Sequence, residues 1–301
     1  MRAGQASRTA EYMALFRALE SVVRPRRARL FEDPYARAFL RPSLRAVVAA
    51  AALPGAGGLL RRLLDERWPG ARSSGVARTR WIDDAMREAC RDVLRQVVIV
   101  GAGFDCRALR LRELAGARIF EIDHPATSAA KRRGLARCLA TLPAGIRFVP
   151  GDLAKVSIDD LLDGAGFDRN TPAFFLWEGV TNYLSEAAVD ATLTAIARVA
   201  APGSRLLFTY VHRGVIDGSA SFPGTAHLAA TLQRAGEPWT FGLHPAAVPE
   251  FLAARGFRLL EDLGAAEYRA RYMPESPGRG YEFYRVALAT VCAEEIAACR
   301  R

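Results

Sequence analysis

Lysine is almost absent from this chain. Lys131 and Lys155 are the only lysines among its 42 basic residues, and the others are arginines. The formal net charge is +10, but the basic residues are spread along the sequence and form no long unbroken run. Because a nucleic-acid site gathers basic residues on one surface, we interpret the arginine excess as a coding bias towards GC-rich codons. We therefore expect no nucleic-acid partner.

Cysteine spacings typical of a metal site are also missing. The sequence has 5 cysteines, an odd number, and no two of them form a CxxC pair. Metal sites and disulfide frameworks both need regularly spaced or paired cysteines. We expect reduced thiols and no metal.

Long apolar runs are missing as well. No run reaches the ~18 residues that a membrane span needs, and residues 1–20 lack the basic-then-apolar order of a signal peptide. We expect a cytoplasmic protein with no membrane partner. With 50% hydrophobic and 25% charged residues, the composition is that of an ordinary globular protein.

The pattern of the chain changes near residue 96. Residues 8–95 read as mostly helical, whereas strands and helices alternate afterwards, which is typical of a parallel sheet with helices on both faces. The expected strands are Val97–Val100, Arg118–Ile122, Ile146–Pro150, Ala173–Glu178, Arg205–Val211, Phe257–Leu263 and Tyr281–Val291. The last two are expected to form a terminal antiparallel hairpin. We predict one α/β domain over residues 1–301, with a helical cap at 1–95, a core at 96–211 and a final segment at 212–301.

Apolar periodicity and capping residues predict the helices. The clearest are Thr9–Ser21, Tyr35–Leu40, Val76–Leu94, Ser185–Ala200 and Ala246–Arg255. Breaks are expected at 54–58 and 68–75, where proline or glycine occurs, and an irregular segment is expected at 213–242.

A glycine turn follows the first expected strand, in the stretch QVVIVGAGFDCRALR. Gly101 and Gly103 permit backbone conformations that other residues avoid, and a ligand can lie against a main chain that lacks Cβ atoms. A helix that begins at Phe104 or Asp105 would place unpaired N–H groups beside the turn. This outlines a nucleotide-type site, although Cys106 replaces the third glycine of a dinucleotide motif and no phosphate-loop GK[ST] is present.

Ligands of such sheets bind beyond the carboxyl ends of the strands. In strand order this selects Gly101–Asp105, then Glu121 and Asp123, then Asp152 and Leu153, then Glu178, and finally Tyr210 and His212. An acid about twenty residues after the turn can accept both hydroxyls of a ribose, and an acid beside a leucine suits an adenine. Together the strand ends predict a nucleoside site, although each acid taken alone is also compatible with a solvated or helix-capping role.

Seven ordered motifs carry a family resemblance. They are TAEYMALFRALE, LFEDPYA, ARTRWIDD, GAGFDCRALRL, FEIDHP, GDL and EGVTNYL. Over about residues 8–211 the chain resembles the leucine carboxyl methyltransferase family and its bacterial relatives, which are class I S-adenosylmethionine-dependent methyltransferases. The resemblance implies S-adenosylmethionine as the cofactor, a Rossmann-like sheet of seven strands with the last one antiparallel, and a lid made by the N-terminal segment.

The resemblance also assigns roles to individual residues. Arg78 matches the arginine that holds the methionine carboxylate of the cofactor, with Arg80 as the alternative. Gly101, Ala102 and Gly103 match the turn beneath the methionine part, Asp123 the ribose acid, Asp152 and Leu153 the adenine contacts, and Glu178 the acid near the amino group. Ile99 departs from the general class I pattern, which has an acid two residues before the first glycine. Arg17 is either a further contact from the lid or part of a plain surface helix.

The resemblance leads to the hypothesis of methyl transfer to an oxygen of a small molecule, in secondary metabolism as in many bacterial relatives. A carboxylate acceptor needs only positioning, whereas a hydroxyl acceptor needs a base. His212 is the best-placed base and Tyr183 could orient the acceptor; a backbone-bonded histidine and a core tyrosine are the alternatives. His124 is expected to shape the turn beside the ribose acid. Further candidates for the acceptor pocket are Phe222, His227, Trp239, Phe241, His244 and Tyr272.

Other functions stay open. They are a carboxyl methyltransferase of protein C-termini, a non-catalytic cofactor-binding protein and an NAD(P)-dependent oxidoreductase, the last disfavoured by Cys106. The identity of the acceptor and the oligomeric state are left open by the sequence.

Overall fold

A seven-stranded sheet organises the chain, in the order β3-β2-β1-β4-β5-β7-β6. The computed structural model describes residues 8–92, 94–153, 155–223, 225, 232, 238–274 and 280–292. The strands are β1 (Gln96–Val100), β2 (Arg118–Asp123), β3 (Ile146–Pro150), β4 (Ala173–Trp177), β5 (Arg205–Val211), β6 (Phe257–Gly264) and β7 (Tyr284–Val291). β1 to β5 are parallel, and β7 lies antiparallel between β5 and β6. The predicted α/β class with an antiparallel last strand is confirmed.

Both faces of the sheet are covered, as the apolar strand β1 predicts. Val98 and Val100 belong to one core cluster, and Val97 and Ile99 belong to the other, because successive side chains of a strand point to opposite faces. The first cluster includes side chains of α7 (Ile158–Gly164), α8 (Glu186–Val199) and α11 (Val248–Ala253). The second includes side chains of α4 (Ala71–Asp92) and α12 (Ala265–Tyr272).

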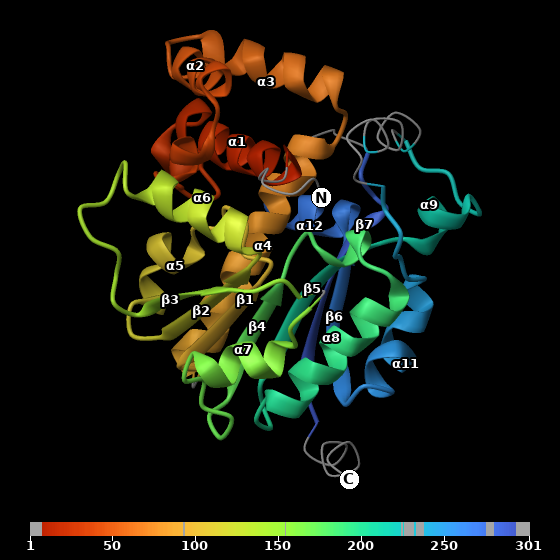
Figure 1. The fold of residues 1–301 in the computed structure, drawn as a ribbon. Coiled ribbons are helices and arrows are strands. Elements are labelled where there is room, and N and C mark those ends of the chain that lie inside the picture. The colour runs from red at the N-terminus through yellow and green to blue at the C-terminus, as the bar shows by residue number, and fades with distance from the viewer. Residues whose placement is uncertain are drawn as a thin grey trace.

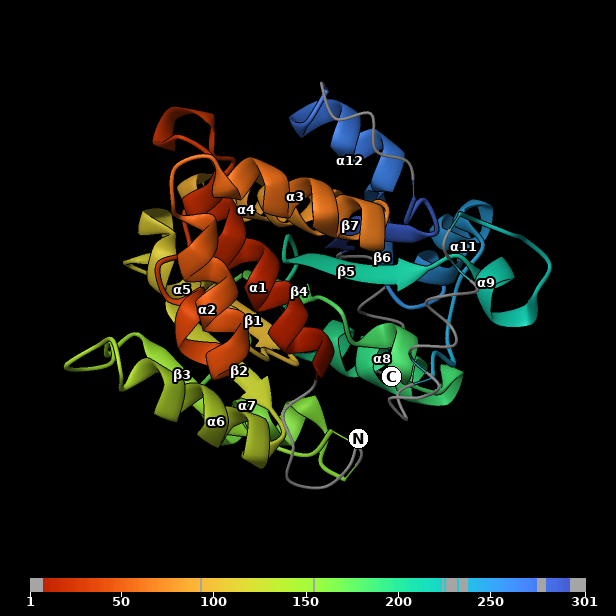
Figure 2. The same ribbon diagram turned by 90° about the horizontal axis from the view of Figure 1, so that it is seen from above.

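A group of helices lies over one end of the sheet, and Figures 1 and 2 show it above the end where β1 leads into the glycine turn. It consists of α1 (Arg8–Val23), η2 (Ala36–Phe39), α2 (Pro42–Ala51) and α3 (Ala56–Arg67). These helices share a third apolar cluster, to which Phe104 of the glycine turn also belongs. The cap is therefore packed directly on the site end of the sheet, whereas α4, also within residues 1–95, covers a sheet face.

Several helix boundaries differ from the prediction. The expected break at 54–58 is shorter, because Gly55 adopts φ 79° as the N-cap and α3 begins at Ala56. The break at 68–75 is shorter too, since α4 begins at Ala71, and the helix expected near residue 35 is the 3-10 helix η2. Predicted helix 246–255 is divided into η5 (Pro245–Ala247) and α11.

The end of the chain is the least predictable part. β6 and β7 pair antiparallel as expected, but α12 connects them in place of a tight hairpin turn. Shorter elements complete the described chain: η1 (Arg26–Ala28), α5 (Arg107–Arg110), η3 (Arg112–Leu114), α6 (Pro125–Leu135), η4 (Thr181–Tyr183) and α9 (Arg213–Asp217). Within the described ranges no helix is long and apolar enough to cross a membrane. His227 lies outside the described residues.

Candidate functional site

The glycine turn is clamped between β2 and the segment that follows β4. The backbone N–H groups of Gly101 and Ala102 both donate to the Ile122 carbonyl, at 2.8 and 3.1 Å. Gly101 has φ +66°, and a Cβ atom there would lie 2.4 Å from a methyl group of Val180. Only glycine therefore fits this position without a shift of its neighbours.

Asp123 ends β2 directly beside this turn. Its carboxylate accepts hydrogen bonds from the backbone N–H groups of Gly103, at 2.5 Å, and His124, at 2.6 Å. Burial raises the pKa of the carboxyl, and the two backbone bonds oppose that rise. Both oxygens keep further lone pairs, so the side chain can still accept hydroxyl groups of a ribose. His124 caps α6 through Nδ1, which accepts from the Ala126 N–H at 3.2 Å, in agreement with its expected turn-shaping role.

Glu121, the other acid of this strand, is paired within the protein. It is buried and forms an ion pair with Lys131 of α6 at 2.6 Å. Burial raises the pKa of this carboxyl even though the lysine opposes the rise. Of the two acids that the strand-end rule selects here, Asp123 is the one beside the glycine turn.

Glu178 follows β4 and is held between two arginines. Arg78 Nε of α4 donates to Glu178 Oε1 at 2.9 Å, and Arg107 Nη1 donates to Glu178 Oε2 at 2.8 Å. Burial favours the neutral acid, but Arg107 and Arg78 outweigh it and lower the pKa of Glu178. The side chain is therefore a fixed carboxylate at the strand end, as the acid near the cofactor amino group would be.

The ion-pair network continues from Arg107 into the protein. Arg107 Nε donates to Asp83 at 2.8 Å, and Arg110 donates to both oxygens of Asp83 at 2.5 and 2.6 Å. Arg107 also forms an ion pair with Asp105 of the glycine turn. These side chains connect the turn, Glu178 and α4, and we did not predict the network, although Arg107 follows the turn directly.

Arg78 matches the position expected for the carboxylate-binding arginine. Its guanidinium lies over the ring of Tyr284, at 4.4 Å from the ring centroid. Its Nη2 lies 3.7 Å from the sulfur of Met13, a weak acceptor that a carboxylate would replace readily. Arg80, the alternative, instead pairs with Asp84 at 2.9 Å on the same helix. The geometry thus favours Arg78 for this role.

Arg17 of α1 is buried rather than on a plain surface helix. Its Nε donates to Asp33 at 2.8 Å, and its Nη2 donates to the carbonyl of Phe104 at 2.5 Å. Arg17 therefore fixes the cap to the glycine turn. The surface position is therefore wrong, and the ligand contact stays a prediction.

Asp152 and Leu153 follow β3, the edge strand of the sheet next to β2. Both are partly exposed, and Leu153 packs against the core cluster that includes Val149 and Ile158. Lys155 lies 3.5 Å from Asp152. The pair therefore offers a carboxylate edge beside an apolar side chain, which is the arrangement expected for an adenine.

His212, the proposed base, caps the short helix α9. Its Nδ1 accepts a hydrogen bond from the Gly214 N–H at 3.0 Å, and its ring lies 5.2 Å from that of His244. Burial, followed by His244 and Arg285, lowers the pKa of His212. Tyr210, two residues earlier, is turned inward. Its hydroxyl donates to Asp262 at 2.6 Å.

Tyr183 lies in η4, directly after Glu178 and the turn that follows it. Its hydroxyl donates to Thr9 Oγ1 of α1 at 3.2 Å, so the side chain connects the strand end with the cap. The contact spans 174 positions in the sequence. A side chain at this junction can contact both the cofactor side and a bound acceptor.

Aromatic rings gather beyond β5 and β7, next to Arg78. The ring of Tyr284 lies 6.3 Å from Trp239, which lies 5.8 Å from Phe283. Of the aromatic candidates in the acceptor segment, Phe222 and Trp239 belong to this group, whereas Phe241 packs in the core and Tyr272 lies against Arg80. Tyr281, Phe283 and Tyr284 were not predicted for the site, because they lie in or near a strand that reads as plain core.

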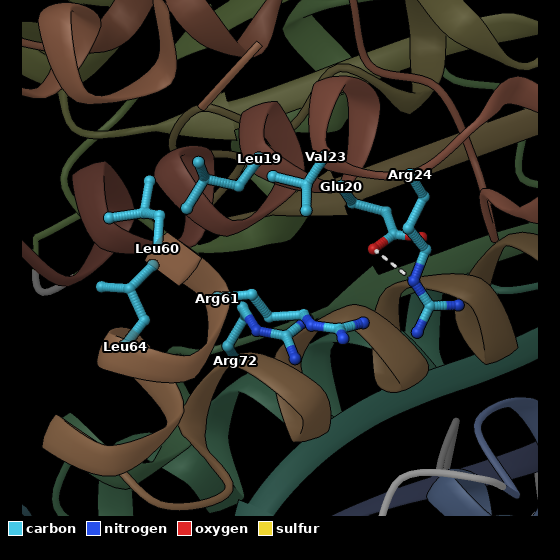
Figure 3. Close-up of a pocket in the computed structure, with 8 residues that line it drawn as sticks. All are labelled: Leu19, Glu20, Val23, Arg24, Leu60, Arg61, Leu64 and Arg72. Carbon is cyan, nitrogen blue, oxygen red and sulfur yellow. Dashed lines mark ion pairs between the residues drawn. The ribbon is translucent and has the colours of Figure 1, made fainter. Parts of the chain in front are cut away.

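A separate hollow lies within the cap, lined by residues of α1, α3 and α4. Figure 3 shows the apolar side chains of Leu19, Val23, Leu60 and Leu64 together with Glu20, Arg24, Arg61 and Arg72. Burial raises the pKa of Glu20, although the Leu30 N–H bond opposes that rise. The hollow is distinct from the strand-end residues, so we do not assign the cofactor to it.

Sequence comparison identifies a family and relatives for this chain. The profile described as leucine carboxyl methyltransferase matches residues 10–197. A Frankia alni protein named "Putative S-adenosyl-L-methionine-dependent methyltransferase" is 36% identical over 226 residues, which is 75% of this chain and 76% of that protein. A protein of the same description from Parafrankia is 34% identical over 280 residues, or 91% of this chain and 84% of that one.

Solved structures with the same fold cover nearly the whole chain. A protein of the DUF574 family from Streptomyces avermitilis aligns with a TM-score of 0.59 and 14% identity, over 96% of this chain and 98% of that one. A protein from Thermobifida fusca aligns with a TM-score of 0.55 and 18% identity, over 91% and 97% of the two chains. At these identities the likeness concerns the fold.

Proposed function

Because the chain belongs to the leucine carboxyl methyltransferase family and is an S-adenosylmethionine-dependent methyltransferase, we propose that it methylates an oxygen of a small molecule. The observation that carries this proposal is the position of Tyr284, which lies between a charged pair of side chains and a group of aromatic rings. Its ring lies beneath the guanidinium of Arg78, which is paired with Glu178, and it also neighbours the ring of Trp239. A charged cofactor end beside an uncharged aromatic group suits a small organic acceptor. A place in secondary metabolism rests on the family resemblance alone.

The proposed roles of the binding residues follow from their charges. The methionine part of the cofactor is a zwitterion, and Arg78 with Glu178 supplies the complementary pair of charges. Asp123 accepts the ribose hydroxyls, Asp152 and Leu153 contact the adenine, and Gly101, Ala102 and Gly103 leave room for the ligand. Held at both ends, the cofactor presents its methyl group in a fixed direction.

In the reaction an oxygen lone pair of the acceptor forms the new C–O bond while the C–S bond breaks and its electron pair stays on sulfur. A carboxylate acceptor is already ionised, so no protein base takes part. A hydroxyl acceptor loses a proton, for which His212 is the candidate base. Tyr183, at the junction of η4 and α1, is the candidate for orienting the acceptor.

The geometry of His212 favours the carboxylate chemistry. Its Nδ1 lone pair already accepts the Gly214 N–H, so in the neutral ring the proton is assigned to Nε2. No lone pair is then left for a substrate proton until the ring leaves Gly214. We therefore place carboxylic acids first among the acceptors and hydroxyl compounds second.

A transfer assay with product analysis tests the proposal. The full chain is incubated with S-adenosylmethionine and three kinds of acceptor: small carboxylic acids, phenols and a peptide that ends in leucine. Mass spectrometry detects the added methyl group, and mild alkali separates methyl esters, which hydrolyse, from methyl ethers, which survive. We expect an alkali-labile product from a small acid.

Two results would contradict the proposal. Methylation of the peptide alone would support a carboxyl methyltransferase of protein C-termini. Tight binding of S-adenosylmethionine without turnover on any acceptor class would support a non-catalytic binding protein. Calorimetry with S-adenosylhomocysteine, with NADH as the negative control, establishes in the same preparation that the cofactor site is intact.

A further inference from the structure

We propose that the aromatic side chains beyond β5 and β7 bind a planar aromatic acceptor, with Trp239 and Tyr281 as the residues that determine this specificity. The inference rests on the proposed function and names the substrate class of the same site. We call these side chains the aromatic wall; they are Phe222, Trp239, Tyr281, Phe283 and Tyr284.

The rings of the aromatic wall are spaced for contact. The ring centroids of Tyr281 and Phe283 are 5.0 Å apart, and those of Phe222 and Phe283 are 5.9 Å apart. Aromatic pairs attract at centroid separations of roughly 4.5–7 Å, and saturated rings lack this electrostatic preference. A planar aromatic ligand can therefore pack against the wall at the same ring separations that the side chains of the wall have among themselves.

The burial pattern of the wall leaves part of it accessible. Phe283 is fully buried at its centre, whereas Phe222, Trp239 and Tyr281 are each only partly buried. The wall ends at Tyr284, and the guanidinium of Arg78 lies 4.4 Å from the centroid of its ring. The accessible aromatic surface thus lies next to the cofactor-binding pair, where an acceptor must be placed.

Trp239 carries a donor that the described protein leaves unpaired. Its Nε1 atom is buried and has no hydrogen-bond partner among the described residues. Asn182 Oδ1 is likewise buried and unpaired in the described structure, and the Asn182 carbonyl accepts the N–H of Thr240, the neighbour of Trp239, at 2.8 Å. Buried polar atoms without partners are rare and destabilising. A polar group on the ring of an acceptor would satisfy the indole N–H.

Tyr281 is held in an unfavourable backbone conformation. Its φ of 63° is the only positive value among the described residues other than glycine. Aromatic residues adopt this region at a cost, and such strain persists where the surroundings impose it, often at functional sites. The turn is held from one side by the buried Arg269, which donates to the Gly280 carbonyl at 2.6 Å and to Glu282 at 2.7 Å.

The strained backbone brings the phenol of Tyr281 to the site. Burial, followed by the nearby Tyr183, raises the pKa of Tyr281 to about 12, and Arg78 opposes the rise. Tyr281 packs against both the aromatic wall and the core cluster that contains Val76 and Ala77 of α4. The phenol therefore lies where the aromatic wall meets the core cluster beneath α4.

Calorimetric titration in the presence of S-adenosylhomocysteine tests the inference, because binding is then measured without turnover. The probes are 6-hydroxy-2-naphthoate and its ring-saturated counterpart, which share the polar groups and differ in planarity. We expect the aromatic probe to bind at least about tenfold more tightly. The attraction of one or two well-placed ring pairs is enough for a tenfold difference in affinity.

Matched variants assign the effect to named residues. Trp239→Phe keeps a ring and removes the N–H, and we expect about tenfold weaker binding of the aromatic probe. Phe148→Leu, which removes a ring from β3 at the opposite edge of the sheet, is the control and should leave it unchanged. Tyr281→Asn tolerates the left-handed backbone but removes the ring, and should lose about tenfold, whereas Tyr281→Phe should retain the affinity. Binding of S-adenosylhomocysteine should be the same in all four.

The outcomes separate this inference from the proposed function. Binding of S-adenosylhomocysteine with equal affinity for the two probes, or an unchanged Trp239→Phe variant, would overturn the aromatic specificity alone. Failure of the wild-type chain to bind S-adenosylhomocysteine would overturn the proposed function and the inference with it. An equal loss in Phe148→Leu would show that the effect is a general one and would also count against the wall.

Discussion

The two halves of the site are held together by different forces. Around Glu178 the side chains are fixed by buried ion pairs, which run from Arg78 through Arg107 to Asp83. Around Tyr284 they are fixed by ring packing, with Arg78 as the charged group that touches both halves. A buried ion pair admits few geometries because an unpaired charge there is very costly, whereas apolar packing accepts replacements of similar volume. The ion-paired half therefore fixes one arrangement of charges, whereas the aromatic half tolerates changes of side chain.

The largest effect is expected from removal of Arg107, the centre of the ion-paired half. Arg107→Ala leaves Asp83, Asp105 and Glu178 each without one partner in a buried place. Breaking a buried ion pair from one side costs about 3–5 kcal/mol of unfolding free energy. Urea unfolding followed by circular dichroism measures this loss.

A surface pair provides the control for that measurement. Arg169 pairs with Asp163 at 2.6 Å, with side chains 38% and 53% exposed. Exposed pairs contribute little, so Arg169→Ala should change the unfolding free energy by less than about 1 kcal/mol. Equal losses in the two variants would mean that burial does not distinguish the ion-paired half.

The next largest effect is expected on cofactor binding. Asp123→Ala removes the carboxylate proposed for the ribose hydroxyls, and we expect its loss to cost about 1.5–3 kcal/mol of binding free energy, the range of one charge-assisted hydrogen bond. We expect S-adenosylhomocysteine to bind about 10- to 100-fold more weakly by calorimetry, with the aromatic half unaffected. A folded variant with wild-type affinity would refute the assignment, and thermal unfolding establishes that the variant is folded.

Acid should weaken the ion-paired half before the aromatic half. Burial raises the pKa of Asp105, but Arg107, Lys131 and Arg17 outweigh burial and bring it from 3.8 to about 2. A carboxyl with a depressed pKa stabilises the fold above its unfolded pKa, and this contribution is lost as the pH falls through the folded value. Asp105 therefore contributes about 2 kcal/mol that disappears between pH 4 and pH 2.

The pH dependence of unfolding checks this sign. The free energy of unfolding of the wild type should fall on acidification over that range, and that of Asp105→Asn should fall less. Parallel curves for the two proteins would show that Asp105 is not a source of the acid sensitivity.

The same contrast explains what could be predicted from the sequence. The bounds of β1 to β6 were predicted to within one residue, because buried strands are continuous apolar runs, whereas β7 begins at Tyr284 and not at Tyr281 as predicted. The acidic cofactor candidates followed from the strand-end rule, since Asp123 ends β2 and Glu178 directly follows β4. These are local signals, and the family motifs contain the same positions.

The rest depends on contacts between distant parts of the chain. Arg107 meets Glu178 across 71 positions, and Tyr183 meets Thr9 across 174. The turn that contains the left-handed Tyr281 is bonded to Arg269 of α12, a contact that no pattern within 281–291 indicates. Likewise α12 carries alternating charged and apolar residues that we did not recognise as a helix between two paired strands. Tertiary contacts decided these features.

The smallest effect is expected at His212 when the acceptor is a carboxylic acid, and the comparison with a phenol tests whether the reaction needs a base. His212→Ala removes an imidazole whose Nδ1 accepts the Gly214 N–H, so the start of α9 loses one cap. With a carboxylic acid as acceptor, kcat/KM should stay within about twofold, because an ionised oxygen needs orientation and no base. With a phenol the rate should fall by about a hundredfold or more if the ring acts as base after leaving Gly214. An unchanged phenol rate would remove His212 as the base, and a large loss with the carboxylic acid would show that the ring orients the acceptor from the aromatic side.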